Sequence, residues 1–129
     1  MSDNAQTLIR RCNTAWQDQD WETLEGCYHP DAILLPPDAG EPITGRSEII
    51  ATYQEFMAVA TINEFVITEL SSFEIAGTNL VHMRFELEYQ LNGQTLKDIG
   101  LEVYVLAADG SGQIVWRNQA ITDQLMLAE

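Results

Sequence analysis

Residues 28–46 constrain the fold more than any other part of the chain. They read YHPDAILLPPDAGEPITGR, which indicates a helix end, a short apolar strand, a proline-rich strap and the start of another helix. Pro36 and Pro37 fix φ and lack amide donors, so the strap cannot be a central strand of a sheet. Gly40 and Gly45 allow backbone turns that other residues resist. The segment therefore predicts a rigid connection between two helical regions.

Composition predicts one folded domain spanning residues 1–129. An apolar content of 46% is sufficient for a core in a chain of this length. No stretch approaches the ~20 consecutive apolar residues of a membrane helix. The first five residues, MSDNA, show no basic region followed by an apolar run, so we see no secretory signal and expect a cytoplasmic protein.

The charge balance excludes two classes of partner. The net charge is −14 and only six residues are Lys or Arg. Binding to nucleic acid and to anionic membranes depends on basic side chains, so we expect neither partner. The acidic residues are scattered along the chain, which favours a solvated surface over an acidic tail.

Cysteine and histidine usage gives no sign of a metal site. Cys12 and Cys27 fall on apolar helical positions, which favours core packing, with a redox pair on two facing helices as the alternative. His29 and His82 lie far apart, and no zinc-type spacing is present. Phosphate-binding and flavin motifs are also absent, so we predict no metal and no cofactor.

The first half of the chain shows helical periodicity. Apolar residues recur at helical spacing from Leu8 to Trp16. Asp20 is a suitable N-cap for a second helix, which ends at residues 29–31. A third helix is predicted over residues 47–60.

The second half reads as strands over residues 63–75, 80–91, 94–106 and 113–122. Residues 80–91 alternate between apolar and polar, and Asn92-Gly93 is a strong hairpin signal. Helices followed by consecutive hairpin strands predict an α+β fold, with the helices on one face of a curved antiparallel sheet.

This order of elements resembles the nuclear transport factor 2-like superfamily, which includes SnoaL-like polyketide cyclases and ketosteroid isomerases. The resemblance rests on four features: the Asp20-Trp21 helix start, the Asp31-Ala32 strand entry, the proline-rich strap and the Gly45-Arg46 helix start. It implies a cone in which the sheet wraps around three N-terminal helices. It also implies an internal pocket and a homodimer formed through the outer sheet face.

The two candidate catalytic carboxylates are Glu102, at a position that the resemblance implies, and Asp38, which lies near such a position. The general-base position of the isomerases falls on Pro36, which has no proton acceptor, and Asp38 lies two residues further along the strap. The Asp38 side chain would point inward only if the register of the strap were shifted. We favour the interpretation that Asp38 begins a turn. The oxyanion-hole tyrosine of the isomerases falls near Cys12, a poorer hydrogen-bond donor.

Counting from the hairpin Gly93 places the oxyanion-hole acid at Glu102. A protonated Glu102 in an apolar cavity would stabilise a developing oxyanion. Strand alternation also allows the opposite register, with Leu101 inside and Glu102 in water, and the general exposure of glutamate favours that register. The sequence leaves both open, as it does the inward or outward direction of Arg117 and Gln119.

A ligand pocket is predicted from inward aromatic and apolar positions, with two polar residues of the last strand. A flat hydrophobic molecule is the predicted ligand, and proton-transfer chemistry by Asp38 or Glu102 is the most concrete reaction. The alternative is a non-catalytic dimeric module that binds protein through the outer sheet face. The predicted pocket residues are Trp16, Tyr28, Tyr53, Phe56, Met83, Phe85, Tyr89, Arg117 and Gln119.

Overall fold

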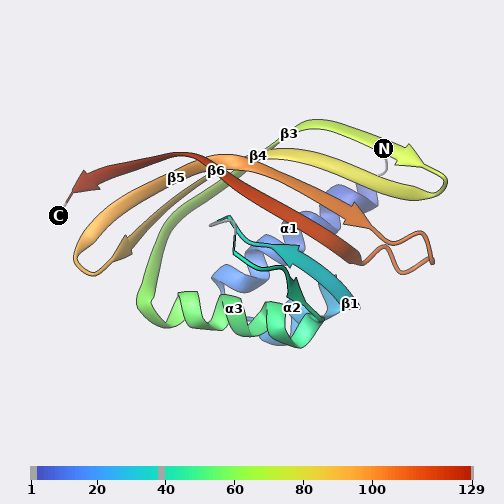
Figure 1. Ribbon diagram of the computed structural model, residues 1–129, viewed down its shortest axis with the longest axis horizontal. Helices are drawn as coiled ribbons and strands as arrows, with labels where there is room; N and C mark the ends of the chain where they lie inside the picture. The colour runs from blue at the N-terminus through green and yellow to red at the C-terminus, as the bar shows by residue number, and fades with distance from the viewer. Residues whose placement is uncertain (1–2, 38–39, 129) are drawn as a thin grey trace.

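The computed structural model describes residues 3–37 and 40–128, and in this part of the chain three helices lie under one curved sheet (Figure 1). The helices are α1 (Asp3–Gln17), α2 (Trp21–Cys27) and α3 (Arg46–Val59). The strands are β1 (Tyr28–Leu35), β2 (Ile43–Thr44), β3 (Ala60–Ile75), β4 (Thr78–Leu91), β5 (Gln94–Leu106) and β6 (Ile114–Ala128). The predicted α+β class is confirmed.

The sheet is mixed, whereas the sequence predicted an antiparallel one. Its strand order is β2-β1-β6-β5-β4-β3. The strands from β3 to β6 form an antiparallel meander, but β1 pairs with β6 in parallel, and Ile33 lies opposite Trp116. Hairpin signals in the sequence report only pairing between consecutive strands, so neither this long-range parallel pair nor the two-residue strand β2 was predicted.

The helices form where the sequence predicts them. Buried residues of α1 recur at helical spacing, and Ile9 and Cys12 are completely buried. The helix ends at Gln17, and the left-handed backbone of Gln19 then turns the chain. The Asp20 carboxylate accepts a hydrogen bond from the Thr23 amide and caps α2. Cys27 is also buried, in agreement with the predicted core role of both cysteines.

Strand alternation determines which side chains face the helices. In β4 the buried positions include Val81, Met83 and Phe85, as predicted. In β5 the buried positions are 98, 100, 102, 104 and 106, while Leu101 is 37% exposed. Glu102 is therefore inside, in the register that the general exposure of glutamate did not favour. Its burial is possible because charged and polar partners surround it.

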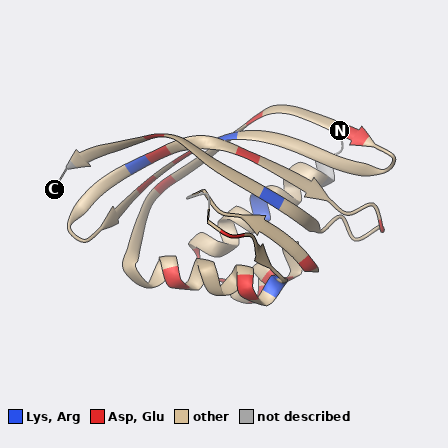
Figure 2. Cartoon of the chain, viewed as in Figure 1, with Lys and Arg blue, Asp and Glu red and all other residues tan. Residues whose placement is uncertain are grey.

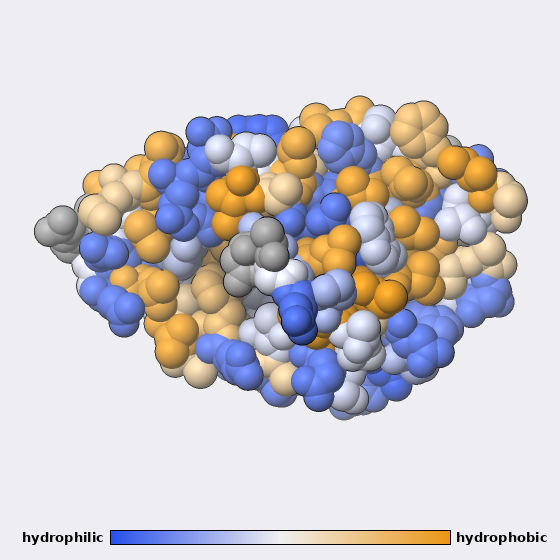
Figure 3. All heavy atoms as spheres, in the orientation of Figure 1, coloured by the Kyte–Doolittle hydropathy of each residue, from blue (hydrophilic) through white to orange (hydrophobic). Residues whose placement is uncertain are grey.

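The outer surface carries most of the charge. Figure 2 shows acidic residues spread over helices and strands rather than gathered in one patch. Apolar and hydrophilic residues are interspersed on the face shown in Figure 3. Within the described residues, no helix is both long and apolar enough to cross a membrane.

Candidate functional site

Arg117 lies at the centre of a buried polar network beneath the sheet. Its side chain is 1% exposed, and its Nη2 lies 2.7 Å from Oε1 of Glu102. Nη1 donates to the hydroxyls of Tyr28, at 3.0 Å, and Tyr53. Burial would lower the pKa of Arg117, but the charge of Glu102 and the surrounding tyrosines outweigh it and raise the pKa well above its usual range. The guanidinium is thus permanently charged.

The carboxylate of Glu102 is fully engaged. Oε1 accepts hydrogen bonds from Arg117 and from Nε2 of Gln119, the latter at 2.6 Å. Oε2 accepts the hydroxyl of Tyr104 at 2.6 Å. Gln119 lies directly opposite Glu102 in the pairing of β5 with β6, and Arg117 lies opposite Tyr104. Sheet register therefore brings all four side chains together, and the cost of burying the ion pair is offset by these hydrogen bonds.

Asn13 connects this network to α1. Its Oδ1 accepts hydrogen bonds from Nη2 of Arg117, at 3.1 Å, and from the indole of Trp16, at 3.0 Å. Its Nδ2 donates to the Tyr104 hydroxyl and to the carbonyl of Ile9. The network thus ties the first helix to the last two strands of the sheet.

The tyrosine hydroxyls are held in their neutral form. Burial is the main cause that raises the pKa of Tyr28, Tyr53 and Tyr104 well above the usual value. Burial and the charge of Asp98 also raise the pKa of Tyr89 to about 12. These four are all the tyrosines of the chain.

We therefore expect tyrosine ionisation to be coupled to unfolding. A raised folded pKa contributes stability that is complete below the unfolded value near 10 and is lost as pH rises through the folded value. For Tyr89 this window runs from about pH 10 to about pH 12. Absorbance at 295 nm, followed with circular dichroism, should show tyrosinate appearing only as the fold is lost. Reversible ionisation near pH 10 in the folded protein would contradict the burial of this network.

A cavity of about 310 Å³ adjoins the network on the helix side of the sheet, and we call it the central cavity. Its walls are mainly aromatic and aliphatic, and its polar lining is limited to a few groups from α3, β5 and β6. Trp16 stacks on Tyr53 with ring centroids 5.6 Å apart, and the Phe65 ring meets Trp16 edge-on. The lining residues are Trp16, Leu34, Pro36, Pro37, Thr52, Tyr53, Phe56, Phe65, Phe85, Leu87, Asp98, Arg117, Gln119 and Ile121.

The chain matches the model of the SnoaL-like domain over residues 9–117. It belongs to the SnoaL-like family. No curated protein is detectably similar to it in sequence. The match covers the residues of the buried network except Gln119, and the lining of the central cavity except Gln119 and Ile121.

Solved structures confirm the nuclear transport factor 2-like fold of this SnoaL-like protein. A ketosteroid isomerase-like protein from Erwinia carotovora atroseptica superposes with a TM-score of 0.78 at 15% identity, covering 92% of this chain and 93% of that one. A nuclear transport factor 2-like protein from Cytophaga hutchinsonii gives 0.77 at 20% identity, covering 94% and 99%. An epoxide hydrolase from Mycobacterium tuberculosis gives 0.65 at 13% identity, covering 91% and 81%. At these identities the likeness establishes the fold.

Six of the nine predicted pocket residues line the central cavity. Tyr28, Met83 and Tyr89 do not: Tyr28 belongs to the Arg117 network, Met83 is packed in the core, and Tyr89 bonds to Asp98. The six that line the cavity are Trp16, Tyr53, Phe56, Phe85, Arg117 and Gln119.

Of the two candidate catalytic carboxylates of the SnoaL-like protein, the structure describes only Glu102. Asp38 lies outside the described residues. Glu102 is completely buried behind Arg117 and Gln119 and does not line the central cavity. Its three hydrogen bonds instead hold the arginine and glutamine that do.

Sequence reasoning missed Asp98, a buried carboxylate of the central cavity. Its exposed fraction is 7%, and it shares the inward face of β5 with Glu102. The signal was available: counting back from an inward Glu102 in steps of two reaches Gly100 and then Asp98. With the direction of Glu102 unresolved, that signal could not be used.

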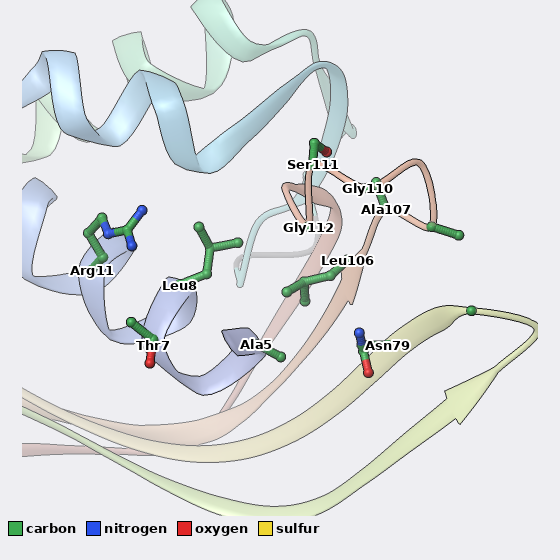
Figure 4. A pocket seen from close by; sticks show the side chains of 12 residues that line it. Ala5, Thr7, Leu8, Arg11, Asn79, Leu106, Ala107, Gly110, Ser111 and Gly112 are labelled. Atoms are coloured by element: carbon green, nitrogen blue, oxygen red, sulfur yellow. The ribbon is translucent and has the colours of Figure 1, made fainter. Parts of the chain in front are cut away.

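A second cavity, of about 430 Å³, lies between the start of α1 and the loop after β5. Figure 4 shows Leu8 and Arg11 of α1 on one side, Ser111 of the loop on the other, and Asn79 of β4 nearby. It shares no lining residue with the central cavity. It also lacks aromatic walls, so we consider the central cavity the candidate site. Within the described residues, no cluster of three or more His, Cys, Asp or Glu residues could hold a metal ion.

Proposed function

We propose that this SnoaL-like protein binds a flat, largely apolar small molecule in the central cavity. The observation that carries the proposal is the cavity itself, whose volume of about 310 Å³ lies at the lower end of the usual range for ligand sites. Aromatic side chains contributed by α1, α3, β3 and β4 suit a planar ring system. The structural neighbours include proteins named as isomerase-like and as an epoxide hydrolase, which is consistent with a small-molecule site in this fold.

The polar groups of the cavity would orient such a ligand. Arg117 and Gln119 are held by Glu102, and Tyr53 is held by Arg117 and by the Tyr28 hydroxyl at 3.2 Å. Groups fixed in this way lose little freedom when a ligand binds, which favours affinity. In the proposed function Glu102 is a positioning residue. Proton transfer would require a carboxylate at the cavity wall, and among the described residues Asp98 meets that requirement.

Narrowing the cavity should weaken binding without unfolding the protein. Ile121 lines the central cavity and is 36% exposed, so Ile121→Trp adds bulk at the wall with little strain. We expect calorimetric titration with 2-naphthylmethanol, a neutral bicyclic probe, to give saturable binding that is weakened at least tenfold in this variant. Leu125→Trp, on the same strand but outside the lining, is the matched control and should bind as the wild type does. Equal affinity in all three proteins would place binding elsewhere.

We propose self-association through the outer sheet face as a second function, because an apolar row crosses five strands there. Ile33, Trp116, Val105, Leu80 and Phe73 are successive register partners from β1 to β3. Their sequence neighbours Leu34, Arg117, Tyr104 and Val81 are buried on the helix side, so the row faces outward. Phe73 is 54% exposed.

Light scattering tests this second function. We expect the wild type to have twice the mass of one chain and Trp116→Glu to be monomeric, because a charge in the row would be desolvated on association. Gln90→Glu adds the same charge on β4 outside the row and should leave the dimer intact. A monomeric wild type at every concentration would refute dimerisation through this face.

A further inference from the structure

Asp98 is a buried carboxylate with hydrogen-bond donors but no cation beside it. The Tyr89 hydroxyl donates to Oδ2 at 3.1 Å, and Nε2 of Gln124 donates to Oδ1 at 2.7 Å. The ion pairs among the described residues do not include Asp98. The neighbouring Lys97 pairs with Glu86 instead, at 3.0 Å. The negative charge of Asp98 is therefore hydrogen-bonded but not neutralised.

The central cavity consequently has an excess of one negative charge. Arg117 is the cation in its lining, and Glu102 neutralises it at 2.7 Å. Asp98 remains, at 7% exposure in a largely apolar wall. A buried charge without a counter-ion is costly, and a ligand of opposite charge removes that cost.

The cavity wall also suits a cation. Phe85 lies against Gly100, where an added Cβ would approach its ring atoms to 2.7 and 2.8 Å, and Gly100 is the next inward position after Asp98. Phe56 packs edge-on against Tyr89, the hydroxyl donor to Asp98, with centroids 5.4 Å apart. Faces of aromatic rings attract ammonium groups, most strongly where water is excluded. Asp98, Phe56 and Phe85 all line the central cavity, so the carboxylate and the rings can meet the same ligand, and we call this part of the wall the cation-binding subsite.

We propose that the ligand of the central cavity carries a protonated amine that pairs with the carboxylate of Asp98. This inference rests on the proposed ligand-binding function and adds the chemical class of the ligand: a flat apolar body with a cationic nitrogen at one end. At a strand rise of about 3.4 Å per residue, Asp98 and Glu102 are roughly 14 Å apart along β5. Gln119 lines the same cavity and gives one amide hydrogen to Glu102, so its second amide hydrogen is available to an acceptor group at the other end of the ligand.

A matched pair of probes tests the proposal on the wild-type protein. 2-Naphthylmethylamine is cationic at pH 7, and 2-naphthylmethanol is a neutral molecule of nearly the same shape. We expect the amine to bind about tenfold or more tightly, because a buried charge-assisted hydrogen bond is stronger than a neutral one. The titrations should be run at 0.15 M salt, where the attraction of distant surface charges is largely screened.

Two variants then assign the preference to Asp98. Asp98→Asn should bring the amine and the alcohol to similar affinity. Asp123→Asn removes one negative charge from an exposed position on β6 and should leave the preference unchanged, which controls for net charge. Near-ultraviolet circular dichroism of each variant shows whether the aromatic packing of the cavity is retained.

The outcomes separate this inference from the proposed function. Equal affinity of amine and alcohol in the wild type, or a preference that persists in Asp98→Asn, would contradict the cation-binding subsite. Neither result would contradict binding of an apolar molecule in the central cavity. Failure of both probes to bind the wild type would overturn the pocket and the subsite together. The comparison of the two probes in the wild type needs no variant, so it can refute the proposal even if Asp98→Asn misfolds.

Discussion

Glu102→Ala is expected to lower the free energy of unfolding by about 3–5 kcal/mol. The substitution leaves the Arg117 guanidinium completely buried without its counter-ion, and it removes the acceptor of Tyr104 and Gln119. An uncompensated buried charge is among the most destabilising changes available in a protein core. The loss should be far greater than for an exposed glutamate.

Urea unfolding followed by circular dichroism measures this effect. Glu86→Ala is the matched control, because Glu86 is also an ion-paired glutamate, but its partners Arg84 and Lys97 lie with it on the solvent side of the sheet. Replacing both partners, as in Glu102→Leu with Arg117→Met, should recover part of the loss since no charge is left unpaired. A Glu102→Ala protein as stable as the Glu86→Ala protein would show that the buried ion pair does not carry the stability assigned to it.

Gly100→Ala is expected to destabilise the fold by about 3 kcal/mol, the upper end of the cost of overpacking. An added Cβ would collide with the backbone carbonyl of Ala120 on β6 and with the ring of Phe85 on β4. The carbonyl cannot move without breaking the pairing of the two strands, which is already irregular between Ile99 and Gly100. The Phe85 ring would be pushed toward the central cavity.

The matched control for this substitution is Gly26→Ala. Gly26 lies in α2, and an added Cβ there would meet no atom within 4 Å. Alanine has the higher helix propensity, so this variant should be more stable than the wild type by up to about 1 kcal/mol. Thermal and urea unfolding of both variants distinguishes steric conflict from a general intolerance of larger residues. Equal stability of the two alanine variants would contradict the close approach of β4, β5 and β6 at Gly100.

Much of the architecture could be predicted from the sequence because local signals were strong. Helical spacing, the Asp20 cap and the Asn92-Gly93 hairpin fixed the elements to within a few residues. The parallel pairing of β1 with β6 could not be predicted, since no turn joins these strands and their contact depends on the whole fold. Whether a helix or strand forms depends mainly on neighbouring residues, whereas this pairing depends on contacts between distant parts of the chain.

The site was harder to predict because its residues contradict the usual rule for charged side chains. Glu102 is completely buried only because Arg117, Gln119 and Tyr104 surround it, and both β5 and β6 must form and pair before those contacts exist. Exposure statistics describe glutamates without such partners. With Glu102 assigned inward, the same alternation would also have placed Asp98 inside.

The central claim is that a flat, apolar molecule enters the cavity beside Trp16, and fluorine NMR tests it most directly. The chain has three tryptophans, of which Trp16 lines the central cavity and Trp21 and Trp116 do not. In protein labelled with 5-fluorotryptophan, titration with 2-naphthylmethanol should shift the Trp16 resonance saturably and leave the other two unchanged. An unshifted Trp16 resonance up to the solubility limit of the probe, or equal shifts of all three, would contradict ligand binding in this cavity.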